Sequence, residues 1–220
     1  MLPSKELEQS TKSMQLEVLK NPAIWILALS SACMYISRYA INSWGIFFLE
    51  NQKAYSSVEA SSIIAVSSVC GIIGTVLSGW LSDKLFKGNR NLPALIFGIC
   101  NTIAITMFVL VPKGYFAIDI FSMILFGLSI GVLICYLGGL MAVDIAPKKA
   151  SGAALGVIGI ASYIGAGIQD ILSGNLIGDS KTVVEGIATY DFSSIRYFWI
   201  GAAAMSFILC AGLWKIKKHI

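Results

Sequence analysis

Arg38 is the one charged residue in a long apolar stretch, residues 23–49. It shares a helical face with three other polar side chains at spacings i, i+3, i+4 and i+7, namely Tyr35, Tyr39 and Asn42. A guanidinium presents a planar fork of donors that matches the oxygens of a phosphate or a carboxylate. The stripe therefore predicts an anion-binding wall. The alternative is a structural ion pair between Arg38 and a carboxylate such as Asp170.

The stretch around Arg38 is long enough to cross a membrane, since roughly 20 apolar residues span the hydrocarbon core. An arginine at that depth costs about 2.5–3.5 kcal/mol on insertion scales, whereas each Leu, Ile or Phe recovers only a few tenths. A charge kept at that cost normally faces a protein interior or a wet cavity. We therefore expect the Arg38 face to line a cavity rather than lipid.

The apolar stretch 151–177 repeats small residues on one face, at Gly152, Gly156 and Gly159, followed there by Tyr163. Small residues at this spacing predict close helix packing. Tyr163 and Asp170 place polar groups on the same face. Asp170 is thus a candidate for a polar cavity, or else lies near the outer surface.

Two further patterns are interpreted as structural. The stretch 58–82 carries small residues at helical spacing, which predicts packing only; they are Ser67, Gly71, Gly74 and Ser78. Trp199 lies near the predicted outer end of its helix, as expected for an interfacial aromatic belt.

The composition is that of an integral membrane protein. The 220 residues are 56% hydrophobic and 13% charged, with a mean hydropathy of +0.78, whereas soluble domains carry about 25% charged residues. The basic residues are dispersed, which argues against nucleic acid as a partner. The cysteines have no CxxC spacing and the single histidine is the penultimate residue, so we expect no metal or cofactor. No hydrolase, protease or nucleotide-binding motif occurs, and the chain is predicted not to be an enzyme.

Polar and basic segments divide the chain into six apolar stretches. The first 22 residues read as a cytoplasmic tail or linker, and Asn21–Pro22 is a typical helix start. The predicted spans are about 23–49, 58–82, 92–111, 117–143, 151–177 and 195–214, with a polar loop at 178–194 and a basic tail at 215–220. We therefore predict an all-α membrane protein with six transmembrane helices.

The distribution of Lys and Arg predicts the orientation. Eleven of these residues lie on the side of both termini and the loops 82–91 and 144–151, against four in the three opposite loops. The positive-inside rule then places both termini in the cytoplasm, with the chain multi-pass in the bilayer.

Three local patterns together resemble a known family. Residues 79–90 (GWLSDKLFKGNR) are similar to the cytoplasmic loop signature of the major facilitator superfamily. Residues 35–39 (YISRY) and 146–152 (APKKASG) resemble the C-terminal half of its organophosphate:phosphate antiporters, which transport glycerol 3-phosphate and hexose 6-phosphates and include a sugar-phosphate sensor. The resemblance implies a twelve-helix fold in two halves, of which this chain would be the C-terminal six helices.

The resemblance also implies roles for particular residues. Arg38 would bind the substrate's phosphate, and Tyr35 and Tyr163 would line the cavity. Tyr39 and Asn42, which share the helical stripe of Arg38, would then help to shape the pocket. The loop residues Gly79, Asp83, Lys84 and Arg90 would form a conformational latch; the alternative is a loop whose charges only orient the protein. The sequence departs from the family at Gly131, where a cavity tyrosine is expected, and at Leu155 and Ile158, where the hexose-phosphate transporter has a charged pair.

The resulting expectation is half of a secondary transporter in the bacterial inner membrane. It would exchange a phosphorylated metabolite, a sugar phosphate or glycerol 3-phosphate, for inorganic phosphate by alternating access. Its partners would be these solutes, the lipid bilayer and a missing N-terminal six-helix half, so that the chain is a fragment, a truncated gene product or one member of a split pair. Two alternatives stay open: a sugar-phosphate sensor that signals to a kinase, and a purely structural bundle.

Overall fold

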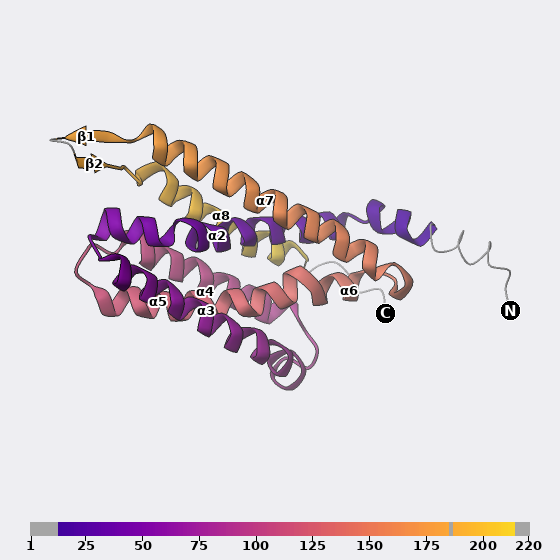
Figure 1. Ribbon diagram of the computed structural model, residues 1–220. Helices are drawn as coiled ribbons and strands as arrows, with labels where there is room; N and C mark the ends of the chain where they lie inside the picture. The colour runs from indigo at the N-terminus through magenta and orange to yellow at the C-terminus, as the bar shows by residue number, and fades with distance from the viewer. Residues whose placement is uncertain (1–12, 185–186, 214–220) are drawn as a thin grey trace, which may run out of the picture.

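The computed structural model describes residues 13–184 and 187–213. Within these ranges six helices are long and apolar enough to cross a membrane. Their principal segments are α2 (Pro22–Lys53), α3 (Ser57–Trp80), α4 (Asn91–Leu110), α5 (Phe116–Cys135), α7 (Ser151–Asp179) and α8 (Ser193–Gly212). The six-helix, all-α membrane fold expected from the sequence is confirmed (Figure 1). Residues 1–12 of the predicted tail and the basic segment 215–220 lie outside the described residues.

Local sequence sets the start of the first two long helices. The Asn21 side chain accepts a hydrogen bond from the backbone N–H of Ala23, and Pro22 occupies the first turn, as the sequence predicts. Before α3, the Ser56 hydroxyl accepts from the Glu59 N–H while the Glu59 carboxylate accepts from the Ser56 N–H, which completes a capping box. These caps satisfy backbone donors that the first helical turn cannot pair internally.

Two helices change winding toward the end of the bundle that carries α6. The α3 helix continues as a π-helical segment, η1 (Leu81–Leu85). The α5 helix continues through a second one, η2 (Tyr136–Leu140), into α6 (Met141–Ile145). A short 3₁₀ turn, η3 (Lys148–Ala150), then leads into α7. Single π turns inside helices frequently mark functional segments.

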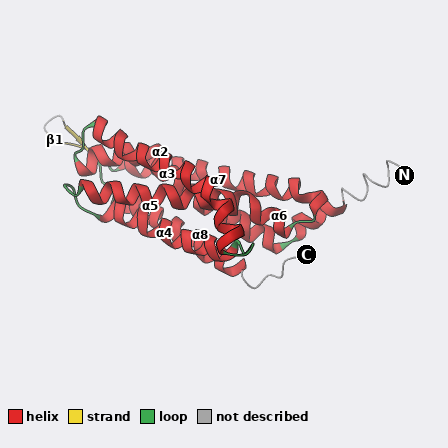
Figure 2. Ribbon diagram, turned by 90° about the horizontal axis from the view of Figure 1, so that it is seen from below, coloured by secondary structure: helices red, strands yellow, loops and turns green. Residues whose placement is uncertain are grey.

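The loop between α7 and α8 contains a small hairpin where the sequence predicts only a polar connection. Strands β1 (Thr182–Val184) and β2 (Ile187–Thr189) pair antiparallel, with Thr182 opposite Thr189. Their hydroxyls lie 2.7 Å apart and form a cross-strand hydrogen bond. The hairpin and α6 lie at opposite ends of the bundle (Figures 1 and 2).

The helices pack in two tight pairs joined by α4 and α8. The α3 helix packs along α5, and α2 packs along α7, while α8 contacts α2 and α4. Glycine permits these close approaches. A Cβ on Gly127 would lie 2.2 Å from the Ser67 carbonyl oxygen, and one on Gly165 would lie 2.6 Å from that of Ala32. The predicted packing role of the 58–82 stripe is thus confirmed at Gly74, where a Cβ would lie 2.4 Å from the Leu128 carbonyl oxygen.

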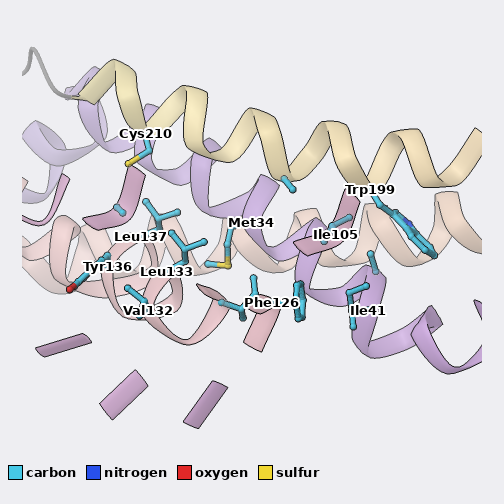
Figure 3. Packing of buried hydrophobic residues seen from close by; sticks show 14 of the residues in the cluster. Met34, Ile41, Ile105, Phe126, Val132, Leu133, Tyr136, Leu137, Trp199 and Cys210 are labelled. Atoms are coloured by element: carbon cyan, nitrogen blue, oxygen red, sulfur yellow. The ribbon is translucent and has the colours of Figure 1, made fainter. Parts of the chain in front are cut away.

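A continuous apolar core lies between the helices, with side chains such as Met34, Leu133 and Trp199 directed into it (Figure 3). Trp199 is fully buried, so its predicted place in an interfacial belt is wrong. Its Nε1–H donates to the Ser173 hydroxyl, which in turn donates to the Gln169 Oε1. The indole is buried because it packs against Phe48 of α2, and Ser173 of α7 satisfies its single polar group.

A buried ion pair joins α2 to α5 at the end of the bundle that carries the hairpin. Lys53, the last residue of α2, donates to Asp119 in the first turn of α5, and both side chains are buried. The Tyr55 hydroxyl donates to the second oxygen of the same carboxylate at 2.8 Å. Burial of the phenol and its hydrogen bond to Asp119 raise the pKa of Tyr55 to about 12. The Lys53 ammonium also lies over the rings of Phe48 and Phe108.

Candidate substrate-binding site

Two tyrosines contact Arg38 near the middle of α2, and a third packs against one of them. The guanidinium carbon lies 5.4 Å from the ring centre of Tyr35 and 5.7 Å from that of Tyr39. The two rings stack at 6.1 Å, and Tyr163 of α7 meets the Tyr35 ring edge-on at 5.5 Å. Residues 35 and 39 are one turn apart on α2, while the parallel packing of α2 on α7 supplies the third ring. Such cation–π contacts restrain the arginine side chain without neutralising its charge.

Arg38 and Asp170 do not form the ion pair that the sequence left open as an alternative to an anion-binding wall. In the described ranges the Lys/Arg–carboxylate pairs are Lys53–Asp119 and Arg90–Asp144. Asp170 lies on α7, partly buried, and its Oδ1 atom is inaccessible and has no hydrogen-bond partner among the described residues. Arg38 is therefore a mid-helix guanidinium whose charge is not met by a carboxylate of the described chain.

Arg38 borders a pocket of about 410 Å³ between α2, α3 and α5. Asn42, one turn further along α2, lines the same pocket. The stripe predicted from the sequence thus divides in two: Arg38 and Asn42 reach the pocket, while Tyr35, Tyr39 and Tyr163 form the aromatic cluster beside it. Pockets of this size hold small metabolites.

The α3–α5 wall of this pocket is the part that sequence reasoning missed. The sequence predicts that the stripe on α3 packs only, yet its members Ser67 and Gly71 line the pocket, together with Thr75. Gly131 lies opposite, and a Cβ there would be 2.2 Å from the Gly71 carbonyl oxygen. The signal available in the sequence was the coincidence of small residues on two neighbouring helices, which brings backbones close and leaves room beside them.

The small residues of α7 do not pack as predicted. A Cβ placed on Gly152, Gly156 or Gly159 would meet no atom within 4 Å in the described chain. They lie on the same side of α7 as Tyr163, which is 62% exposed. The close approach on α7 is instead made by Gly165 against α2. Helical spacing identifies a small-residue face, but it does not say which neighbour that face meets.

Of the four predicted latch residues, Arg90 makes an interhelical connection. Its Nη1 donates to the Leu140 carbonyl oxygen at 2.8 Å and to the Asp144 carboxylate at 2.7 Å, which joins the α3–α4 loop to η2 and α6. Gly79, Asp83 and Lys84 are exposed. A second connection follows nearby, because the Tyr136 hydroxyl of η2 donates to the Ser78 carbonyl oxygen at 2.6 Å.

The described residues contain no cluster of His, Cys, Asp or Glu suited to a metal ion. The site brings a guanidinium, an amide and phenol rings to a pocket, and these groups can bind an anionic ligand.

Comparison with known proteins decides the family. The sequence model of the Major Facilitator Superfamily matches residues 2–169. The chain belongs to the major facilitator superfamily. A solved member with the same fold is the proton:xylose symporter XylE, bound to 6-bromo-6-deoxy-D-glucose. It superposes with a TM-score of 0.64 at 15% identity, over 94% of this chain and 46% of that one. The major facilitator fold in this chain is thus one six-helix half, as the sequence predicts.

Curated relatives place the chain beside the organophosphate:phosphate antiporters, which confirms the resemblance. The glycerol-3-phosphate transporter of Bacillus subtilis is 35% identical over 74% of this chain and 36% of its own length. The membrane sensor protein UhpC of Salmonella typhimurium is 33% identical over 69% and 34%, respectively. A probable hexose phosphate transport protein of Chlamydia trachomatis is 32% identical over 79% and 38%. The chain thus matches little more than a third of these relatives.

Proposed function

We propose that this chain forms one half of a major facilitator transporter that exchanges a phosphate monoester for inorganic phosphate. The observation that carries the proposal is Arg38, a guanidinium at mid-helix that faces a pocket and has no carboxylate partner in the described ranges. A charge in that position needs an anion, and the pocket leaves space for one to arrive.

Phosphate suits this arrangement better than a simple halide or hydroxide would. The guanidinium fork can donate two parallel hydrogen bonds to two oxygens of one phosphate. The Tyr35 and Tyr39 rings hold the guanidinium from one side, so little conformational entropy remains to be lost when the ligand binds. Asn42 reaches the same pocket and supplies an amide donor one turn away.

Exchange would need a second six-helix half. The relatives with phosphate-ester names are nearly three times the length of the matched region, and substrates in such transporters bind at midplane between two halves. The exposed α7 face around Gly156, Gly159 and Tyr163 offers a surface for that partner. The Arg90–Asp144 connection would act as the latch, because it ties the α3–α4 loop to α6 in the conformation seen here.

Arg38→Lys in the full protein tests the assignment. Proteoliposomes loaded with unlabelled phosphate would be assayed for counterflow of ³²P-labelled phosphate. Lysine keeps the charge and loses the bidentate fork, so uptake should fall at least about tenfold. Arg196→Lys is the matched control, since Arg196 lies near the start of α8 and outside the pocket, and its uptake should be unchanged. Equal counterflow in wild type and Arg38→Lys would refute the role of Arg38.

The same vesicles separate transport from sensing, the activity in the name of one relative. A transporter accumulates labelled phosphate inside the vesicle in exchange for the unlabelled phosphate that leaves it. A sensor would bind the label with the same dependence on Arg38 but accumulate none.

A further inference from the structure

A buried polar link joins α4 to α2 next to Arg38. The Asn101 side-chain amide on α4 donates from Nδ2 to the Ser37 hydroxyl on α2 at 3.2 Å, and both side chains are fully buried. The Ser37 hydroxyl donates its own hydrogen to the Met34 carbonyl oxygen at 2.8 Å. Its oxygen can therefore only accept from a neighbour, which fixes the orientation of the Asn101 amide. The link thus reaches α2 one residue before Arg38.

The link is enclosed by apolar side chains and lies away from the pocket. Met34 and Ile105, which lie one turn from Ser37 and Asn101 respectively, both belong to the apolar core (Figure 3). Neither Ser37 nor Asn101 lines the pocket that Arg38 borders. The link can therefore influence a ligand there only through the helix that carries Arg38.

Asn101 does not have the side chain that stability alone would favour. Its Oδ1 atom is buried and accepts no hydrogen bond from the described residues. An unpaired carbonyl oxygen in an apolar interior destabilises a fold, and asparagine is a poorer helix former than leucine. Leucine branches at the same carbon and would avoid both penalties. The amide is thus explained better by what it orients than by the stability it adds.

The other contacts near Arg38 leave the rotation of α2 less well defined. The two tyrosine rings that hold the guanidinium belong to α2 itself and turn with it. Ser30 and Ser31 form hydrogen bonds to α8 and α7, but they lie about two turns before Arg38. Apolar packing tolerates small rotations of a helix, whereas a hydrogen bond is directional. In the described chain, Ser37 is the residue of α2 closest to Arg38 in sequence whose side chain forms a hydrogen bond to another helix.

We infer that Asn101 is a positioning residue for Arg38. Its hydrogen bond to Ser37 fixes the rotation of α2, and with it the direction in which the guanidinium fork meets a ligand in the pocket. Binding groups must be held within about 0.5 Å and 10–20° of the productive geometry. A small turn of α2 therefore weakens one of the two parallel hydrogen bonds that the fork can donate to phosphate. The inference rests on the proposed function and adds to it a residue that the ligand does not touch.

Asn101→Leu tests the inference with two readouts. The variant creates no unpaired donor, since the Ser37 hydroxyl keeps its bond to Met34. Binding of ³²P-labelled inorganic phosphate to the full protein is measured in detergent by scintillation proximity, and the Kd should rise at least about fivefold. In a titration with sodium dodecyl sulfate the variant should be at least as stable as wild type, because a buried unpaired carbonyl is removed. A Kd equal to that of wild type would overturn the inference.

Ser37→Ala tests whether Asn101 acts through the link. This variant leaves the Asn101 amide without its acceptor, so stability should fall in the same titration. The Kd for phosphate should nevertheless rise by the same factor as in Asn101→Leu. The double variant should bind phosphate as each single variant does, because both substitutions remove one shared hydrogen bond. Effects that multiply in the double variant, or a Kd that follows stability instead of the link, would contradict the inference.

Thr102→Val is the matched control on α4. Thr102 follows Asn101 in the sequence, and its hydroxyl donates to the Gly98 carbonyl oxygen of the same helix. The variant removes a hydrogen bond but leaves the link to α2 intact, so its Kd for phosphate should stay within about twofold of wild type. A rise equal to that in Asn101→Leu would show that any loosening of α4 has this effect, and the positioning role would be refuted.

Failure of the two proposals can be told apart. If Arg38→Lys binds phosphate as tightly as wild type, the proposed function fails and this inference fails with it. If binding depends on Arg38 but is unchanged in Asn101→Leu and Ser37→Ala, the inference alone fails.

Discussion

Replacing Asp119 with asparagine would leave Lys53 as an unpaired ammonium inside the bundle. Lys53 is 5% exposed and Asp119 is fully buried, so bulk water cannot replace the lost partner. The rings of Phe48 and Phe108, which flank the ammonium, offer only weak compensation. The substitution keeps the size of the side chain and its acceptor for the Tyr55 hydroxyl, so the main change is the loss of one charge.

The expected cost follows from the burial of the pair. Removing one partner of a buried ion pair typically lowers the free energy of unfolding by about 3–5 kcal/mol, because the remaining charge is uncompensated. Replacing both partners with apolar residues is often neutral. We therefore expect Asp119→Asn to lose about 3–5 kcal/mol, and the double variant Lys53→Met with Asp119→Leu to lie within about 1 kcal/mol of wild type.

The assay is unfolding in mild detergent by titration with sodium dodecyl sulfate, followed by circular dichroism. Asp179→Asn is the matched control, because Asp179 ends α7 at the same end of the bundle and is exposed. That change should fall within about 0.5 kcal/mol of wild type. A loss below about 1 kcal/mol in Asp119→Asn would refute the reasoning, as would a double variant less stable than the single one.

Three further predictions concern helix contacts, the Arg90–Asp144 ion pair and pH. Gly165→Ala should lower the free energy of unfolding by about 1–3 kcal/mol, because its Cβ would lie 2.6 Å from the Ala32 carbonyl oxygen; Gly201→Ala, with no atom within 4 Å, should raise it by about 0.5–1 kcal/mol. Arg90→Gln should lower it by about 1 kcal/mol in the same titration, less than a fully buried pair because the Arg90 and Asp144 side chains are about a quarter exposed. Since the pKa of Tyr55 is raised to about 12 in the folded protein, its stabilising contribution should be complete below pH 10 and be lost as pH rises through 12, as absorbance at 295 nm and circular dichroism can follow together.

Each of these has a contradicting outcome. Equal effects of alanine at positions 165 and 201 would show that the α2–α7 approach is not limited by backbone contact. If Arg90→Gln and Asp144→Asn lower stability additively in the double variant, the two side chains act independently and the connection carries no coupling. Ionisation of the Tyr55 hydroxyl near pH 10 would show that the Asp119 contact does not persist in detergent.

The sequence by itself determined the membrane class, the number of helices and the family. Long apolar stretches separated by basic loops predict membrane-spanning helices, because a helix pairs all of its backbone polar groups within the segment that crosses the membrane. Helical spacing also placed Arg38 on one face with the tyrosines and Asn42. The cap at Asn21 was predictable because it depends only on residues next to one another in the chain.

The tertiary structure decided which neighbours those faces meet. Asp170 and Asp119 are both acidic residues in apolar stretches, yet Asp119 meets Lys53 while Asp170 does not meet Arg38. The glycines of α7 looked like packing residues and face open space, whereas Gly127 and Gly131 bring α3 and α5 into contact and help to form the pocket beside Arg38. Spacing along one helix fixes which side chains share a face, but the partner of that face depends on how separate helices cross, and contacts between residues distant in the chain determine those crossings.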